Sequence, residues 1–210
     1  CGFKGNIFTY FGEKANHLQV RRELLKKNIR EKRSESVGLS FPRNLSSYSG
    51  NWRDIKPETY KRFEAFQHPD SDYIGRINFP IRDISGRIVA FNGRHTTGGT
   101  PKYMISPAGA KMPLFPIVDP IQGSVILVEG IFDMLNMWQL GYHNTLCIFG
   151  CTNFSRKKLD ILDRIGVTRV DILMDPDVAG QRAANKIAEL LDSKNIVSRN
   201  IVLPDGVDPG

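Results

Sequence analysis

From residue 124 onward, short apolar runs alternate with longer segments in which apolar residues recur at helical spacing. Short apolar runs between turn signals are typical of buried parallel strands. The segments between them carry their apolar residues on one helical face. We therefore predict strands over 124–128, 144–149, 167–174 and 196–203, and helices over 131–140, 154–165 and 178–191. Repeated strand–helix units predict a parallel sheet with right-handed crossovers, and hence an α/β fold.

The segment before residue 120 has a different pattern. We predict a short helix over 57–66, because the proline at its start is accepted in the first turn of a helix. Residues 75–81 alternate between apolar and polar side chains, and residues 88–91 return after a turn, which predicts a β-hairpin. Residues 92–103 are polar and rich in glycine, so we predict a loop that buries no core. This part is expected to be a mixed α/β subdomain.

The two patterns divide the chain into an N-terminal mixed α/β subdomain over 37–120 and a parallel-sheet subdomain over 121–210. Residues 17–29 have apolar positions at near-helical spacing, whereas 30–36 are charged and have no apolar anchor. We expect residues 1–36 to end in a linker. The chain starts Cys-Gly-Phe-Lys-Gly, without an initiator methionine, which favours a fragment or a processed product.

Charge and cysteine content narrow the class of protein. The net charge is +7 and the pI is about 9.4, which favours a polyanionic partner, although a basic surface without a partner gives the same values. No apolar run approaches the roughly 18 residues of a membrane span, so no membrane association is expected. Cys1, Cys147 and Cys151 do not suit a disulfide framework, which favours a reducing cytoplasm. Cys147 lies within an apolar run and is expected to be buried.

Two acidic clusters follow predicted strands. Glu129 comes directly after the first strand of the parallel-sheet segment, and Asp133 lies four residues later in the next helix. Asp175 and Asp177 follow the third strand, on either side of Pro176. Because the carboxyl ends of parallel strands meet at one edge of a sheet, we expect these acids to converge. Oxygen ligands alone suit Mg²⁺ or Mn²⁺, so the clusters predict phosphoryl or nucleotidyl transfer that depends on a metal.

Two alternatives to this metal site stay open at the level of sequence. Asp177 precedes a predicted helix and would serve equally well as its N-cap. Glu129 would then be a polar residue at the end of a strand. Asp205 and Asp208, which follow the fourth predicted strand, are further candidate ligands.

A basic segment precedes the acidic clusters. It carries Arg94, Lys102 and Lys111, with Tyr103 beside one of these cations. Cations neutralise phosphates and an aromatic ring stacks on a base, so the segment is suited to single-stranded nucleic acid. A flexible basic loop without a ligand is the alternative interpretation.

The acidic pattern resembles the TOPRIM domain, which primases, topoisomerases, some nucleases and recombination factors share. The resemblance rests on Glu129-Gly130 with Asp133, followed by Asp175-Pro176-Asp177 with Ala179-Gly180. It implies a TOPRIM-type, Rossmann-like parallel sheet over residues 121–210.

Three further segments, 76–94, 100–107 and 203–209, resemble the DnaG-type DNA primases of bacteria and phages. The resemblance implies that Glu129, Asp175 and Asp177 are the metal-binding acids of a polymerase centre. Asp133 and Asp208 would assist them in holding Mg²⁺ or Mn²⁺. The family commonly has another aspartate where this chain has Gly210.

The same resemblance assigns roles to the basic segment and to the first residue. Arg94, Lys102, Tyr103 and Lys111 correspond to a basic ridge that handles template or nucleotide phosphates. The segment from Cys1 to Asn6 resembles the end of the family's zinc ribbon, which implies that Cys1 is the last zinc ligand of the full-length protein.

The expected function is therefore that of a primase catalytic core, which joins ribonucleoside triphosphates on a single-stranded DNA template. The family resemblance also implies a replicative helicase and a single-stranded-DNA-binding protein as partners of the full-length protein. One alternative is a metal-dependent nuclease or topoisomerase-like protein with a TOPRIM domain. The other is a fragment that binds single-stranded DNA without catalysis.

Overall fold

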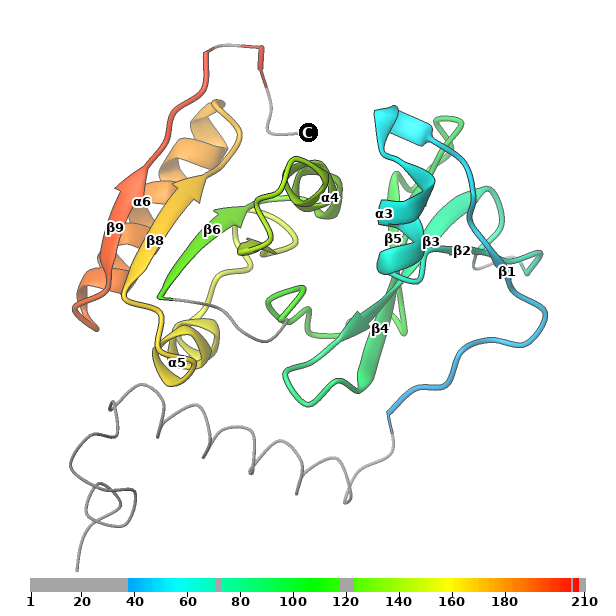
Figure 1. Ribbon diagram of the computed structural model, residues 1–210, viewed down its shortest axis with the longest axis horizontal. Coiled ribbons are helices and arrows are strands. Elements are labelled where there is room, and N and C mark those ends of the chain that lie inside the picture. Colours follow the sequence, from blue (N-terminus) through cyan, green and yellow to red (C-terminus); the bar gives the residue numbers. More distant parts are fainter. Residues whose placement is uncertain (1–37, 71–72, 118–122, 205, 208–210) are drawn as a thin grey trace, which may run out of the picture.

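Two β-sheets, one antiparallel and one parallel, lie side by side with helix α4 between them (Figure 1). The computed structural model describes residues 38–70, 73–117, 123–204 and 206–207. The predictions for the helix over 17–29, the linker, Cys1, Asp205 and Asp208 lie outside these residues. Within the described ranges, no helix combines the length and the apolar character that crossing a membrane requires.

The first sheet is antiparallel, with strand order β1-β2-β3-β4-β5. Its strands are β1 (Ser46–Ser47), β2 (Phe66–Gln67), β3 (Arg76–Arg82), β4 (Ile88–His95) and β5 (Tyr103–Ser106), accompanied by the helices η1 (Trp52–Asp54) and α3 (Pro57–Arg62). The predicted hairpin is confirmed, because β3 pairs with β4. Helix α3 starts at the predicted proline but ends four residues early, because Glu64 has a φ of 56° and the chain then enters β2.

The prediction of a loop over residues 92–103 is wrong at both ends of that range. Strand β4 continues to His95, and β5 begins at Tyr103. Asn92 is 4% exposed, and it pairs with Phe79 on one side and Ile105 on the other. The polar side chains suggested a loop, but the backbone here is hydrogen-bonded to strands on both sides, which the local sequence does not reveal.

The second sheet is parallel, with strand order β7-β6-β8-β9, so the predicted α/β pattern is confirmed. Its strands are β6 (Ser124–Val128), β7 (Thr145–Cys147), β8 (Arg169–Leu173) and β9 (Val197–Asn200), and its helices are α4 (Ile131–Gln139), α5 (Arg156–Arg164) and α6 (Val178–Asp192). Strands β7, β8 and β9 are shorter than predicted. Strands β7 and β9 lie at the edges of this four-stranded sheet, and β7 forms one further antiparallel bridge, between Cys147 and Phe115.

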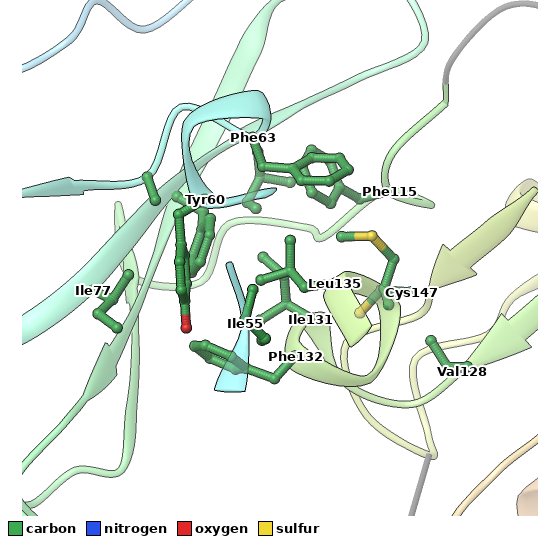
Figure 2. Packing of buried hydrophobic residues seen from close by; sticks show 14 of the residues in the cluster. Ile55, Tyr60, Phe63, Ile77, Phe115, Val128, Ile131, Phe132, Leu135 and Cys147 are labelled. Carbon is green, nitrogen blue, oxygen red and sulfur yellow. The ribbon is translucent and has the colours of Figure 1, made fainter. Parts of the chain in front are cut away.

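Strand β6 divides the core between the two faces of its sheet. Val125 and Leu127 belong to a cluster with residues of α5 and α6, whereas Val128 belongs to a cluster with α4 and the antiparallel sheet. This alternation is what a strand covered on both faces requires. Figure 2 shows the cluster that contains Val128, in which Phe132 and Cys147 lie among residues of both sheets. Cys147 is fully buried, as predicted.

Candidate active site

A cavity of about 310 Å³ lies between the carboxyl ends of strands β6 and β8 and the antiparallel sheet. Its walls have opposite charge. The carboxylates come from the parallel-sheet half and the cations from the first half of the chain: Glu129, Asp133 and Asp175 on one side, and Arg53, Arg94 and Lys102 on the other. The sequence predicted that acids at the ends of parallel strands would meet, and three of them line one cavity.

The turn between β6 and α4 fixes the first two acids. Gly130 is the N-cap of α4, and its backbone N–H donates to Oδ2 of Asp133 at 2.8 Å. A Cβ atom on residue 130 would lie 2.7 Å from the same oxygen. The glycine therefore leaves room for the Asp133 carboxylate against the backbone, next to Glu129. This packing gives a physical reason for the order Glu-Gly-x-x-Asp.

The start of α6 fixes the acids that follow β8. Oδ1 of Asp177 accepts a hydrogen bond from the backbone N–H of Gly180 at 2.7 Å, so Asp177 is the N-cap of α6. This is the alternative role that the sequence left open for Asp177. Its side chain is exposed and is not among the residues that line the cavity. Asp175 does line it. A Cβ atom on Gly180 would lie 2.3 Å from the carbonyl oxygen of Asp175.

Replacing Gly180 by alanine is expected to destabilise the protein, although alanine normally stabilises a helix by about 1 kcal/mol relative to glycine. The new methyl group meets a backbone oxygen, so α6 or Asp175 must shift, at a cost of roughly 1–3 kcal/mol. Chemical denaturation of the variant measures this loss. Ala179→Gly, on the exposed side of the same turn, is the control for helix propensity alone. A Gly180→Ala variant more stable than the parent would contradict the packing argument.

Cys151 contacts the acidic wall and was not predicted as a site residue. Its Sγ donates a hydrogen bond to Oε2 of Glu129 at 2.7 Å. Burial, followed by the nearby carboxylates of Glu129, Asp177 and Asp175, raises the pKa of Cys151 to about 12. The thiol is therefore protonated at neutral pH and acts as a donor to Glu129, rather than as a reactive thiolate. All three predicted catalytic acids influence this one thiol, so they lie in the same region.

Arg94 and Tyr103, both predicted, form the centre of the basic wall. The Arg94 guanidinium lies 4.8 Å from the ring centre of Tyr103 and 5.5 Å from that of Trp52. Burial raises the pKa of Tyr103, and the nearby Arg94 partly opposes this. Contact with two aromatic rings fixes the orientation of the arginine side chain. Lys111 is exposed and does not line the cavity.

Arg53 lines the cavity but was missed in the sequence. Its guanidinium lies 5.4 Å from the ring centre of Trp52 and 5.9 Å from that of Phe132. Its backbone has a φ of 56°, a left-handed conformation that non-glycine residues seldom adopt. This backbone belongs to a short turn without helical or strand periodicity, so no sequence signal pointed to the residue.

The donor set fits a hard divalent cation but does not complete a site by itself. In the described part of the chain, no group of three or more His, Cys, Asp or Glu side chains is arranged to hold a metal ion. Mg²⁺ needs only one or two protein carboxylates when substrate phosphates and water supply the other ligands. The three carboxylates that share this cavity meet that requirement, and all their donor atoms are oxygen.

Comparisons with known proteins agree with this architecture. Residues 61–115 match a family model described as the N-terminal domain of the DNA primase catalytic core, and residues 126–210 match one described as Toprim-like. A DNA primase of Pseudomonas putida is 32% identical over 72% of this chain, and the match covers 24% of that protein. The solved structure of the DnaG catalytic core is 28% identical, with a TM-score of 0.56, over 65% of this chain and 47% of that one.

A second solved structure was determined with DNA. It is the RNA polymerase domain of Mycobacterium tuberculosis DnaG, in complex with a double-stranded DNA oligomer that has a 6-nucleotide overhang. It is 26% identical, with a TM-score of 0.53, and the match covers 69% of this chain and 51% of that one. The chain spans between about a quarter and about a third of the length of curated relatives that it matches.

Proposed function

The chain belongs to the DnaG-type DNA primases, and from this premise we propose that its cavity is the polymerase centre of a primase core. In this proposal the protein joins ribonucleoside triphosphates into short RNA primers on a single-stranded DNA template. The observation that carries the proposal is the division of one cavity into a carboxylate wall and a cationic wall. Such a site can hold a divalent cation and a polyphosphate together.

The acidic wall would hold Mg²⁺ or Mn²⁺. We propose Glu129, Asp175 and Asp177 as the principal residues for metal binding and catalysis, with Asp133 and Asp208 in support. Asp177 would contribute with the carboxylate oxygen that does not cap α6. A bound divalent ion would lower the pKa of the attacking 3′-hydroxyl and neutralise charge on the triphosphate.

The basic wall would hold the phosphates. Arg94, Lys102 and Arg53 would offset the charge of the nucleotide or of the template backbone. Tyr103 lies against Arg94 and is 39% exposed, so its ring is available for stacking on a base. Lys111 would act further along the bound strand, outside the cavity.

The full-length protein would have further partners. We propose that a zinc ribbon with Cys1 as its last ligand precedes this core. A replicative helicase and a single-stranded-DNA-binding protein would place it at the replication fork in the cytoplasm. These proposals rest on membership of the primase family.

The test is incorporation of labelled ribonucleoside triphosphates by the 210-residue chain on single-stranded DNA, with Mg²⁺ or Mn²⁺. Products should require both template and metal, and EDTA should abolish them. Degradation of the DNA with no use of nucleotides would indicate a nuclease instead. Salt-sensitive DNA binding that is indifferent to metal, without products, would indicate a non-catalytic fragment.

A further inference from the structure

Asn92 lines the cavity, and its side chain carries a buried polar atom that lacks a partner among the described residues. Its side chain extends from β4 in a residue that is only 4% exposed. The Oδ1 atom is buried, and within the described part of the chain it accepts no hydrogen bond. Buried polar atoms are nearly always satisfied in folded proteins, so an unpartnered one in a residue that lines a cavity points to a ligand.

A second asparagine of the same hairpin provides a comparison. The amide nitrogen of Asn78 donates to the carbonyl oxygens of three residues, at 3.4, 3.2 and 3.2 Å: Phe66, Tyr73 and Arg76. Asn78 pairs with Gly93, one residue beyond Asn92, so the two asparagines point to opposite faces of the sheet. The Oδ1 atom of Asn78 also lacks a hydrogen-bond partner among the described residues, but its amide nitrogen holds neighbouring strands together. Unlike Asn92, Asn78 is not among the residues that line the cavity. The cross-strand neighbours of Asn92, Phe79 and Ile105, are apolar and offer its carboxamide no partner.

Arg94 has a complementary unpartnered atom. It lies two residues after Asn92 on β4, so both side chains are on the same face, and both line the cavity. Its Nε atom is buried and makes no hydrogen bond among the described residues. Nε–H is a donor and the Asn92 Oδ1 is an acceptor. A ligand that satisfies both must carry a hydrogen-bond donor and an acceptor close together.

The parts of a nucleotide differ in what they offer to Asn92. Ionised phosphates are acceptors only, so they satisfy Arg94 but not the Asn92 oxygen. Amino and ring N–H groups of the bases are donors, but their kind and position differ from base to base, and template-directed synthesis uses all four bases. The ribose hydroxyls are donors that every ribonucleotide carries, and the sugar and phosphate oxygens beside them are acceptors.

We propose that Oδ1 of Asn92 accepts a hydrogen bond from a ribose hydroxyl of the bound nucleotide, so that Asn92 favours ribonucleotides over their deoxy analogues. Nε–H of Arg94 then donates to an oxygen of the same sugar–phosphate unit. This inference rests on the proposed function, because it takes a nucleotide as the ligand of the cavity. It assigns a specificity-determining role to a residue that sequence patterns placed in a loop.

The experiment compares the parent chain with Asn92→Leu, which has similar volume and no polar atom. Calorimetric titration with ATP, 2′-deoxy-ATP and 3′-deoxy-ATP, in Mg²⁺ and without template, measures binding separately from polymerisation. We expect the parent to bind ATP more tightly than at least one deoxy analogue. Asn92→Leu should weaken ATP binding by about 5- to 30-fold, which is the effect of losing one buried hydrogen bond. It should leave unchanged the binding of the deoxy analogue that the parent binds less tightly than ATP. The hydroxyl that this analogue lacks is then the one that donates to Asn92.

Thermal unfolding without nucleotide provides the structural control. Asn92→Leu should unfold at the same temperature as the parent or higher, because it removes an unsatisfied buried polar atom. Asn78→Leu should unfold at a lower temperature, because losing the hydrogen bonds that its amide nitrogen donates to three carbonyl oxygens outweighs removing its unpartnered Oδ1. The proposal is overturned if Asn92→Leu leaves ATP binding unchanged, or weakens all three nucleotides equally. If binding selectivity responds as expected but no primer is made, the proposed function fails and the assignment of Asn92 stands.

Discussion

Substitution of Glu129 by glutamine is expected to lower template-directed incorporation of ribonucleotides by about 10²- to 10³-fold, the range for losing one charge-stabilising group at an active site. Glutamine has the size of glutamate and still accepts a hydrogen bond from the Cys151 thiol. It lacks the negative charge that a divalent cation needs. The loss should therefore arise from metal binding and transition-state charge, and the fold should be retained. Initial rates of incorporation at saturating nucleotide, over a range of Mn²⁺ concentrations, measure this loss of activity.

Glu189→Gln is the matched control for this substitution. Glu189 is exposed on α6, so the same change in charge and shape occurs away from the cavity. Incorporation by this variant should equal that of the parent. Glu129→Gln reduces the carboxylates that line the cavity from three to two, so the variant should be at least as stable as the parent in metal-free buffer. Equal incorporation by Glu129→Gln and the parent would remove Glu129 from the catalytic site.

The sequence was informative about the parallel sheet and its acids for a physical reason. Strands of a parallel sheet are covered on both faces, so they form uninterrupted apolar runs, and β6 has the predicted bounds of 124–128. Their carboxyl ends meet at one edge, so acids that directly follow two strands must be neighbours. Glu129 and Asp175 follow from this reasoning alone.

Arg94, Lys102 and Tyr103 of the basic wall were predicted, but three other residues at the site were not, because tertiary contacts bring them there. Arg53 reaches the cavity through a left-handed backbone and two aromatic neighbours, none of which leaves a periodic pattern. Asn92 lies in a stretch whose polarity suggests a loop, yet pairing with β3 and β5 buries it. Cys151 contacts Glu129 across two separate strand–helix units, a distance of 22 residues along the chain. Each of these residues was missed because its position at the site depends on contacts with residues remote in sequence.

The two halves of the cavity keep their relative positions through the core that lies behind it. Phe132 on α4 is 1% exposed, with its ring centre 5.0 Å from that of Trp52 and 5.7 Å from that of Phe79. Both contacts are T-shaped and join the parallel-sheet half to the antiparallel half. The neighbouring residues Asp133 and Arg53 belong to opposite walls of the cavity. The aromatic cluster therefore connects the two halves of the chain that supply the two walls of the cavity.

Phe132→Ala is expected to lower the free energy of unfolding by about 3–5 kcal/mol, because it leaves a cavity between two packed layers. For a chain of this size the midpoint of thermal unfolding should fall by roughly 10 °C. Circular dichroism during heating and urea titration measures both quantities. Tyr142→Ala removes an aromatic ring that is 51% exposed and should change stability by less than about 0.5 kcal/mol. Because Phe132 also supports Arg53, nucleotide binding should weaken at temperatures where the variant is still folded. A loss of less than 1 kcal/mol, with binding intact, would mean that the two halves do not depend on this ring.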